Sequence, residues 1–584
     1  MPARKVRTDT TTGPARMAPG PLALCGALLL SSCAAAPSRP DETADLVIMG
    51  GDVVTEDPAH PQATAVAVRG GVIAYVGDDA GARRCVGRAT RVIDAGGATV
   101  LPGLIDSHIH VMDGALSQRA CSFEDQPLAV AQLAPVIHAC AARAPGDGWV
   151  EVVRLNGAGF HADRHDLDAI LADRPLLLWA ADGHDAWANS EALRRAGVTR
   201  DSVNPSNGAL GRDERGEPNG FLVDSAVNLV ARLIERPGAA IREQALLTTL
   251  HDLAADGITA FLEANTNAET VGTYVELARK GQLHARVSMA LQSDGIAGDA
   301  EFARLRALRE LAATQPLLRA DLIKLFADGV MEYPAHTAAM LEPYLAADGR
   351  AGTNRGPSYF ERGPLAQFAR RAASEGFGVH VHAIGDRAAR LALDAFADAR
   401  SSGSQRSYSI AHLELVDATD LPRFRELDVI ASLQLQWARP DNYSVEAVLP
   451  YIGPERQARL YPERSLQRAG ATIAGGSDWD VSTYNPFEAM AVGISRFNPE
   501  EPQRGVLGRD ETLPLHELFA AYTINAARLL GRESEIGSLA VGKAADFIVL
   551  DRHLDDSSSA TQVLGTRVRY TFVSGSLLVE PANP

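Results

Sequence analysis

The sequence contains little cysteine and fewer basic than acidic residues. Five cysteines occur in 584 residues, and 73 aspartates and glutamates against 56 lysines and arginines give a formal net charge of -17. A nucleic-acid-binding surface needs basic side chains to neutralise phosphates, so this balance argues against a nucleic-acid partner. The chain also lacks a G-x-S-x-G motif, which disfavours a Ser-His-Asp hydrolase built on that turn.

A long apolar run is missing near the N-terminus. Basic residues from Arg4 to Arg16 precede the stretch PLALCGALLLSSC (21–33), which is too short for a stable transmembrane helix. A basic leader before a short apolar core is typical of a secretory signal. We therefore predict an exported protein.

The end of this stretch, LSSC (30–33), resembles the lipobox of bacterial lipoprotein signals. The resemblance implies that residues 1–32 are a signal peptide and that the sulfur of Cys33 carries lipid. It places the protein on a bacterial membrane, facing the periplasm or the cell envelope, with residues 33–44 as a flexible tether. A plain signal peptide cleaved within residues 34–36 is the alternative.

Three cysteines, Cys85, Cys121 and Cys140, belong to the mature chain. In an exported protein Cys121 could pair with Cys140. An odd number of cysteines and their spacing do not fix a pairing, so the disulfide stays open at this point.

Both ends of the mature chain are rich in short strand patterns. Residues 45–100 include DLVIMGGDVVT and AVAVRGGVIAYVG, which alternate in character and break at Gly-Gly pairs. The segments GSLAVGKAADFIVLD (537–551) and VRYTFVSGSLLVE (568–580) are similar. We predict that residues 45–100 and 505–584 form one small composite β-sandwich.

Between these ends, short apolar runs alternate with amphipathic helical stretches. Buried parallel strands read as continuous apolar runs, and helical crossovers separate them. Eight such runs therefore predict an α/β fold with a (β/α)8 barrel of the TIM type over residues 101–504. The runs are 103–110, 257–264, 284–291, 320–329, 377–386, 409–415, 429–437 and 472–480.

One interval is too long for a simple barrel connection. The first run ends near residue 110 and the second begins near residue 257, about 150 residues later, far beyond a usual βα loop. We predict an insertion subdomain over about residues 113–245 that mixes strands and helices.

Side chains of a metal-binding kind cluster at the carboxyl ends of these runs, where barrel loops build active sites. They are His108, His110, Lys324, His380, His382, His412 and Asp478. Each histidine alone could form a structural hydrogen bond, and Asp478 could cap a helix. Lys324 lies inside an apolar strand, where its ammonium must be paired, neutral or chemically modified. Together, imidazoles and a carboxylate at one rim predict a metal site.

The order of these residues resembles the amidohydrolase superfamily, and more narrowly the Amidohydrolase-3 (YtcJ-like) family. The motifs LPGLIDSHIH, DGHDAWANSEAL, KLFADGV, HVHAIGDRA, HLEL, GGSDWD and VGKAADFIVLD occur in that family's order over roughly residues 45–580. The resemblance implies an amidohydrolase that cleaves the C–N bond of a small-molecule amide, with a homodimer as a candidate assembly. It does not name the substrate.

The resemblance also implies divalent metal ions, two of zinc as the first choice, with manganese, iron or cobalt as alternatives. It assigns His108, His110 and Asp478 to one ion, and His382 and His412 to the other. Zinc takes imidazole and carboxylate ligands, and a catalytic site keeps one position open for water. The number of ions, one or two, stays open.

In the family the strand-four lysine reacts with CO2, and the resulting carbamate on Lys324 would bridge the two ions. His382 fits the family's H-A-x-G-D landmark better than His380 does, although strand alternation points both side chains the same way. Metal ions lower the pKa of a bridging water, and Asp478 would act as the general acid and base.

Three alternative functions use the same barrel. One is a deaminase, although single-metal deaminases of the superfamily generally lack the bridging lysine. The second is a lactone, ester or phosphoester hydrolase. The third is a non-catalytic binding lipoprotein, against which the intact set of ligand residues argues.

Substrate contacts are predicted at Asp182, His184, Arg387 and Gln434. The family places the histidine of DGH in the active site, whereas Arg387 could bind an anionic group or pair with Asp386. Many relatives have a Gln-Pro-x-His landmark on strand seven, but this chain reads QLQW (434–437) and lacks the histidine. The resemblance therefore does not define the substrate contacts on that side of the pocket.

Overall fold

The computed structural model describes residues 43–580 except 145 and 347. The predicted signal peptide, Cys33 and nearly all of the tether lie outside the described residues. The central element is an eight-stranded parallel sheet in the order β19-β18-β17-β16-β15-β14-β13-β7. This confirms the predicted barrel. Its strands are β7 (Leu104–Ile109), β13 (Ile258–Thr266), β14 (Arg286–Gln292), β15 (Leu318–Phe326), β16 (Gly378–Ala383), β17 (Tyr408–His412), β18 (Val429–Leu433) and β19 (Thr472–Gly475).

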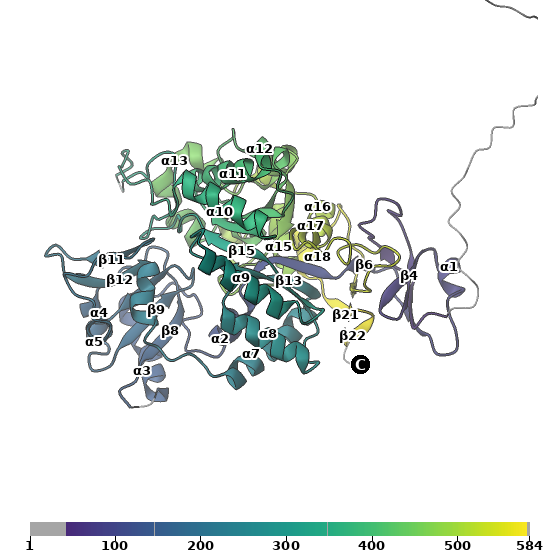
Figure 1. The fold of residues 1–584 in the computed structure, drawn as a ribbon, viewed down its shortest axis with the longest axis horizontal. Helices are drawn as coiled ribbons and strands as arrows, with labels where there is room; N and C mark the ends of the chain where they lie inside the picture. Colours follow the sequence, from purple (N-terminus) through teal and green to yellow (C-terminus); the bar gives the residue numbers. More distant parts are fainter. Residues whose placement is uncertain (1–42, 145, 347, 581–584) are drawn as a thin grey trace, which may run out of the picture. The chain divides into compact units, whose positions relative to one another are not determined.

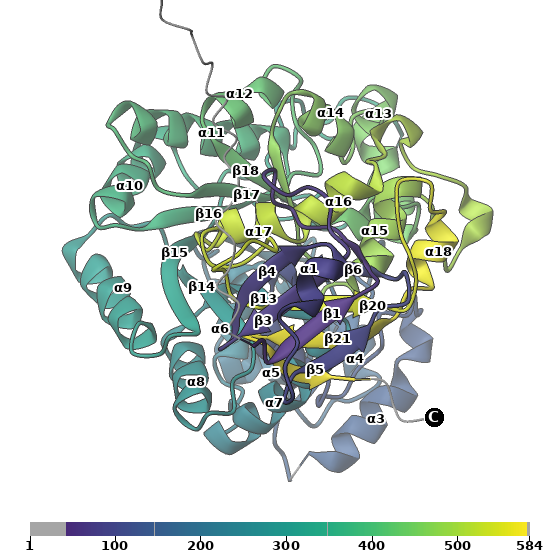
Figure 2. The same cartoon turned by 90° about the vertical axis from the view of Figure 1, so that its right-hand side faces the viewer.

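The barrel strands are covered on both faces. Every residue of β7, β16, β17 and β18 is buried, because apolar side chains fill the barrel and also contact the outer helices. Figure 2 shows helices α8 to α12 around the outside of the strands. The barrel helices are α7 (Ala239–Ala255), α8 (Ala268–Arg279), α9 (Asp299–Ala312), α10 (Arg362–Ser374), α11 (Asp386–Ser401), α12 (Leu421–Glu426), α13 (Leu449–Gln457), α14 (Glu463–Arg468) and α15 (Pro486–Ser495).

Strands β7 and β19 stand at the two ends of the strand order, and the segment after β19 joins them. The Asp478 N–H donates to His108 O at 2.7 Å, and the Ser477 N–H donates to the Asp106 carboxylate at 3.1 Å. Gly476 permits this approach, because a Cβ there would lie 2.8 Å from His108 N. The closure therefore brings Asp478 beside the histidines of β7.

The long interval between β7 and β13 contains a separate five-stranded sheet in the order β11-β12-β10-β9-β8. It has its own apolar core, which includes Trp187, and Cys121 and Cys140 form a disulfide with a Cα–Cα distance of 5.9 Å. Figure 1 shows the labelled elements of this insertion grouped together in blue. The insertion elements are α3 (Ala134–Arg143), β8 (Val150–Leu155), α4 (Arg164–Asp168), β9 (Leu176–Ala180), β10 (Asp185–Ala188), α5 (Ser190–Ala196), β11 (Gly208–Arg212), β12 (Pro218–Asp224) and α6 (Asn228–Ala231). Helix α2 (Val111–Ser117), which precedes them, packs on α7 of the barrel.

Both ends of the described chain contribute to two further sheets, with orders β4-β3-β1-β5 and β2-β6-β20-β21-β22. β6 pairs antiparallel with β20, and Ile48, Val66, Phe547 and Phe572 share one apolar core. The elements are β1 (Leu46–Met49), β2 (Asp52–Val53), β3 (Ala65–Arg69), β4 (Val72–Gly77), α1 (Asp79–Arg83), β5 (Arg91–Asp94), β6 (Thr99–Pro102), β20 (Phe547–Leu550), α18 (Ala560–Leu564), β21 (Val568–Val573) and β22 (Ser576–Val579).

Helices α16 (Leu515–Ala521) and α17 (Ile524–Leu529) fall within the predicted sandwich segment 505–584 but pack on the barrel. Their connection accepts a hydrogen bond from β7, between Ile105 N and Tyr522 O at 2.7 Å. In the part of the chain that the structure describes, no helix combines the length and apolar character of a membrane span.

Candidate active site

The predicted metal ligands come from five barrel strands and meet at the carboxyl end of the barrel. His108 lies in β7, Lys324 in β15, His382 in β16 and His412 at the end of β17. His110 follows β7 at the start of α2, and Asp478 follows β19. Parallel strands place their carboxyl ends at the same rim, so residues more than 300 positions apart in the chain become neighbours.

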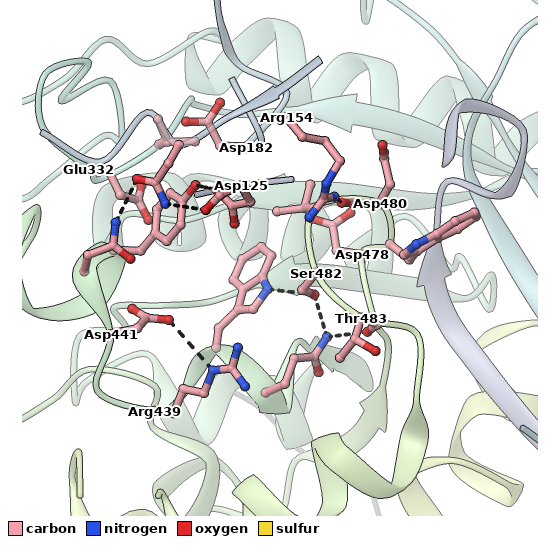
Figure 3. A pocket seen from close by; sticks show the side chains of 18 of the residues that line it. Asp125, Arg154, Asp182, Glu332, Arg439, Asp441, Asp478, Asp480, Ser482 and Thr483 are labelled. Atoms are coloured by element: carbon pink, nitrogen blue, oxygen red, sulfur yellow. Dashed lines mark hydrogen bonds and ion pairs between the residues drawn. The ribbon is translucent and has the colours of Figure 1, made fainter. Parts of the chain in front are cut away.

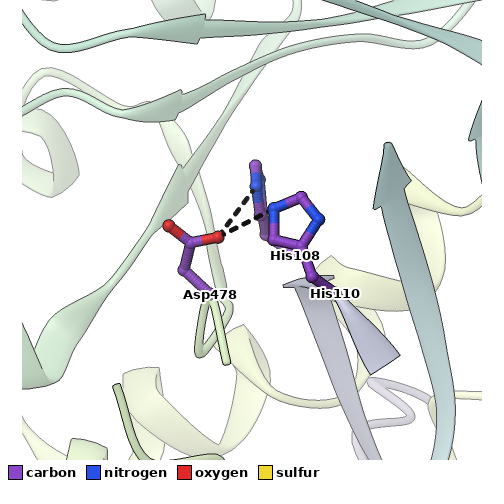
Figure 4. Close-up of side chains that lie close together, drawn as sticks. All are labelled: His108, His110 and Asp478. Atoms are coloured by element: carbon purple, nitrogen blue, oxygen red, sulfur yellow. Dashed lines mark ion pairs between the residues drawn. The ribbon is translucent and has the colours of Figure 1, made fainter. Parts of the chain in front are cut away.

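The tightest group consists of His108, His110 and Asp478, whose side chains point toward one another in Figure 4. One ligand atom from each lies within 4.8 Å of the others. The Asp478 Oδ1 atom is 3.1 Å from His110 Nε2 and 3.4 Å from His108 Nε2. Two imidazole nitrogens and one carboxylate oxygen form a donor set that suits zinc and leaves room for water.

His380 and His382 occupy different positions although both lie on β16. His380 Nε2 is 2.7 Å from His108 Nδ1, and His380 Nδ1 is 2.7 Å from Ser409 Oγ. Both nitrogens of His380 are therefore occupied: Nε2 holds the His108 ring and Nδ1 bonds Ser409, a common arrangement for the residue behind a metal ligand. His382 Nε2 donates to Gly329 O at 3.0 Å, which leaves its Nδ1 with the lone pair.

Among the predicted ligand atoms that the structure describes, His412 Nδ1 is buried without a hydrogen-bond partner. Asp478 Oδ1 belongs to an almost fully buried side chain and faces the imidazole nitrogens of His108 and His110. His412 Nδ1 lies 3.8 Å from Asp478 Oδ2, and both residues have positive φ, 76° and 53°. Buried polar atoms are normally satisfied, and residues held in this conformation concentrate at functional sites. A metal ion would satisfy both atoms, so the residues present fit one.

The electrostatics of three rim imidazoles suit a metal, whereas the hydrogen bond to Asp478 and its charge raise the pKa of His110 despite burial. Burial lowers the pKa of the imidazoles of His108, His382 and His412, so they are neutral at pH 7 and have a lone pair to offer. Burial lowers the pKa of Lys324 to about 7, and its Nζ is 3.2 Å from His108 Nε2. Lys324 is therefore an amine that is partly neutral at physiological pH.

A cavity of about 840 Å³ opens beside these residues. Asp478, His382 and His412 line it from the barrel, while Asp182 and His184 line it from the insertion. Figure 3 shows labelled side chains from both, including Asp182, Arg154 and Asp478 around one space. The cavity is large enough for a small organic substrate.

Comparison with protein families matches residues 91–579 to the model of the amidohydrolase family. The chain belongs to the amidohydrolase family. Membership makes the protein a metal-dependent hydrolase that acts on carbon–nitrogen bonds, as the sequence predicted. The barrel rim is therefore the candidate active site of an amidohydrolase.

Similar proteins agree with this assignment. The chain is 28% identical over 557 residues to N-substituted formamide deformylase of Arthrobacter pascens, covering 92% of this chain and 98% of that protein. It is 25% identical over 544 residues to YtcJ of Bacillus subtilis, covering 91% and 98%. A metal-dependent hydrolase of Pyrococcus horikoshii has the same fold, with a TM-score of 0.66 at 23% identity, covering 88% of this chain and 99% of that one.

On the insertion side of the amidohydrolase cavity, His184 is paired with an acid that the sequence did not single out. His184 Nδ1 lies 2.6 Å from Asp224 Oδ1, and the Tyr359 hydroxyl donates to Asp224 Oδ2. Burial by itself would lower the pKa of His184, but the hydrogen bond to Asp224 and its charge raise the pKa to about 9. His184 is therefore a cation at neutral pH, and its ring centroid is 5.0 Å from that of His382.

Two of the predicted substrate contacts lie away from the cavity lining. Arg387 donates to Gly356 O at 2.5 Å, and Asp386 instead accepts from Leu341 N. Arg387 therefore does not pair with Asp386, and it is not among the residues that line the cavity. Gln434 is buried, but the residues of QLQW that line the cavity are Gln436 and Trp437.

This shift along strand seven has a local cause. The chain leaves β18 at Leu433 and turns into a short 3-10 helix over Leu435–Trp437, which directs the next side chains toward the cavity. Trp437 stacks on His412 with a ring-centroid distance of 5.3 Å. Trp437 stands at the sequence position of the landmark's histidine, so an indole contributes to this wall of the cavity.

Several lining residues were not predicted from the sequence. They include Asp125, Arg154, Glu332, Glu414, Arg439, Asp441 and Tyr443. Burial raises the pKa of Asp125 to about 6 and that of Glu332 to about 7. Glu414 stands inside the HLEL motif, two residues after His412, so its position was the signal that could have revealed it.

Proposed function

We propose that this amidohydrolase uses divalent ions and water to hydrolyse an amide-type C–N bond of a small molecule. The observation that supports it most is the convergence of His108, His110 and Asp478, beside a His412 Nδ1 that is buried and without a hydrogen-bond partner. Such a donor set needs a bound cation to satisfy it.

The proposed ligands divide into two groups. His108, His110 and Asp478 would hold one ion, and His382 and His412 would hold the other. Zinc suits these nitrogen and oxygen ligands, and manganese, iron or cobalt would also accept them. Bound there, the ions would lower the pKa of water and polarise the substrate carbonyl.

Lys324 would join the two groups as a carbamate. Its neutral amine would attack CO2, form a nitrogen–carbon bond and release one proton, so the neutral side chain would become an anionic oxygen ligand. The buried position and the pKa of about 7 favour the neutral amine that this reaction needs. Without this change, the side chain would add a positive charge beside the ions, which would oppose their binding.

Asp478 is the proposed general acid and base. Its carboxylate takes a proton from the attacking water and later delivers it to the leaving nitrogen, so a carboxylic acid and an amine are released. His184, held as a cation by Asp224, would stabilise the negative charge that develops on the carbonyl oxygen. An N-substituted formamide is the first substrate to test, because a similar protein is a deformylase of such compounds.

A single-ion enzyme, such as a deaminase, is the second candidate. The closest donors, His108, His110 and Asp478, would suffice for one ion. Lys324 favours the two-ion hydrolase, because a deaminase with one ion has no use for a bridging lysine. Lactone and ester hydrolysis would use the same groups on a carbonyl with an oxygen leaving group.

The test combines metal analysis with an activity screen. We expect about two divalent ions per purified chain, and hydrolysis of N-formyl or N-acyl amines that stops with a chelator and returns with zinc or manganese. One ion per chain together with ammonia release from amino-heterocycles would favour the deaminase. A metal-free protein with full amidase activity would contradict both.

We further propose export and lipid anchoring at Cys33. The basic leader and LSSC motif support it, and the Cys121–Cys140 disulfide suits an oxidising compartment. Replacing Cys33 by alanine should move the protein from the membrane fraction to the soluble fraction, and unchanged membrane retention would contradict the anchor. A homodimer stays a prediction, which sedimentation of the purified protein tests.

A further inference from the structure

The wall of the cavity carries many more acids than permanent cations. Among the residues that the structure describes, eleven aspartates and glutamates line it, together with three arginines. Asp478 belongs to the proposed metal centre, but that centre accounts for only one of these carboxylates. The others need a separate explanation.

The three arginines are already engaged by other groups. Arg439 Nη1 is 2.8 Å from Glu488 Oε1, and Arg504 Nη1 is 2.7 Å from Glu446 Oε1. Arg154 donates to the backbone oxygen of Asp480. None of these three contacts involves Glu332 or Glu414. The arginines that line the cavity therefore do not pair with these two acids in the contacts given.

Glu332 and Glu414 each have a buried carboxylate oxygen that accepts no hydrogen bond. In both side chains this atom is Oε2, and Glu414 is only 2% exposed. Both residues line the cavity, as does Asp441, which lies 3.8 Å from Arg439 Nε. A buried carboxyl oxygen without a hydrogen-bond partner is unfavourable, so a ligand that brings an N–H donor into the cavity would relieve this cost.

Of these acids, Glu414 lies close in the chain to a residue of the proposed reaction centre. Glu414 is two residues after His412, and two residues span at most about 7 Å. Figure 3 shows Glu332 and Asp441 at the left of the cavity, on the other side from Asp478. These acids and Asp478 line the same cavity, so one small molecule can contact both. Val330 and Ile384 also line the cavity and offer apolar contacts.

We propose that Glu332, Glu414 and Asp441 form a subsite that binds an alkylammonium group of the substrate, beside the metal centre. This rests on the proposed function, since it names the substrate as an amide with a positively charged tail. A metal ion is the less suitable occupant: among the described residues, the donors that lie within 4.8 Å of one another are His108, His110 and Asp478, and these acids are not in that group.

A matched pair of substrates tests the charge preference. We compare N-formyl-1,4-diaminobutane with N-formylpentylamine, in which a methyl group replaces the terminal ammonium. We expect at least about 10-fold higher kcat/KM for the cationic substrate, expressed mainly in KM. Glu332→Gln and Glu414→Gln should each reduce this ratio by about 3-fold or more, while the exposed Glu426→Gln on α12 should leave it unchanged. A ratio near one in the wild type would overturn the subsite.

Direct binding separates this proposal from the proposed function. We measure butylammonium and 1-butanol binding to the metal-loaded protein by calorimetry, with thermal melting to confirm that each variant is folded. Selective ammonium binding that both glutamine variants weaken would support the subsite even if no amide were hydrolysed. Amide hydrolysis without charge preference, together with equal binding of both compounds, would overturn the subsite and leave the proposed function standing.

Discussion

Two kinds of buried histidine lie in or beside the cavity. On the barrel side, burial lowers the pKa of His108, His382 and His412, and these rings are neutral. On the insertion side, Asp224 lies 2.6 Å from His184 and raises its pKa to about 9 despite burial. The difference shows that the carboxylate partner, and not burial alone, decides the charge of an imidazole here.

The cavity has a barrel wall (His382, His412 and Asp478) and an insertion wall (Asp182 and His184), and the two walls suit different chemistry. Neutral imidazoles can bind a metal ion, whereas a protonated imidazole cannot but can stabilise an anion. The barrel wall should therefore contribute the larger part of catalysis, and the insertion wall the orientation and charge stabilisation of the substrate. Substitutions on the two walls should differ in size and in pH dependence.

The largest effect is expected on the barrel side, at Asp478. Asp478→Asn keeps the shape of the side chain but removes both the charge that binds the ion and the group that moves the proton. We expect kcat/KM to fall by at least about 10³-fold, with a lower metal content by elemental analysis. Glu426→Gln serves as the control for a lost surface charge. A loss below tenfold would break the assignment of catalysis to the barrel wall.

Lys324→Ala should rank next. Removing the proposed carbamate should lower kcat/KM by about 10²- to 10³-fold, because the ions lose an anionic ligand. Acetate or propionate at millimolar concentration should restore part of the activity in this variant and have no effect on Asp478→Asn. Full activity without added carboxylate would show that Lys324 has another role, such as packing over Phe326, whose ring centroid is 4.8 Å from Nζ.

The barrel wall could be predicted from the sequence because its rule is simple. A buried parallel strand is a continuous apolar run, and a polar residue at its end points to the rim, as at His108, Lys324 and His412. The composite pairing of β6 with β20 followed from the strand patterns at both chain ends in the same way. In these elements the local sequence pattern is enough to predict where the residues lie in the fold.

The insertion wall and the loops have no comparable rule. Asp224 contacts His184 across 40 residues, and its side chain is placed by the end of β12, not by any periodicity. Arg387 was expected in the pocket from the GDRA motif, but in the structure it reaches Gly356 O in a distant loop. The residue that faces a cavity from a loop depends on tertiary contacts that a single sequence does not contain.

A smaller effect, with a distinctive pH signature, is expected on the insertion side. If protonated His184 is the active form, kcat/KM should fall as pH rises through about 9, since the cation exists only below its pKa. Asp224→Asn removes the charge that raises this pKa, so the alkaline limb should move to lower pH, with about a 10-fold loss at pH 8. Metal content should be unchanged. If the alkaline limb of the pH profile did not move in Asp224→Asn, protonated His184 would not be the active form. The proposed difference between the barrel wall and the insertion wall would then be wrong.

The smallest effect on activity is expected from the disulfide within the insertion. Cys121 and Cys140 are 19 residues apart, and a cross-link over a loop of this length stabilises by about 3 kcal/mol in the chain-entropy model. The double serine variant should therefore lower the melting temperature and increase proteolysis between β7 and β13, while kcat/KM changes less than about threefold. Cys85→Ser is the matched control, because Cys85 is a free thiol in the described chain. A loss of activity as large as that of Asp478→Asn would show that the insertion positions the metal centre itself, and the division between the two walls would fail.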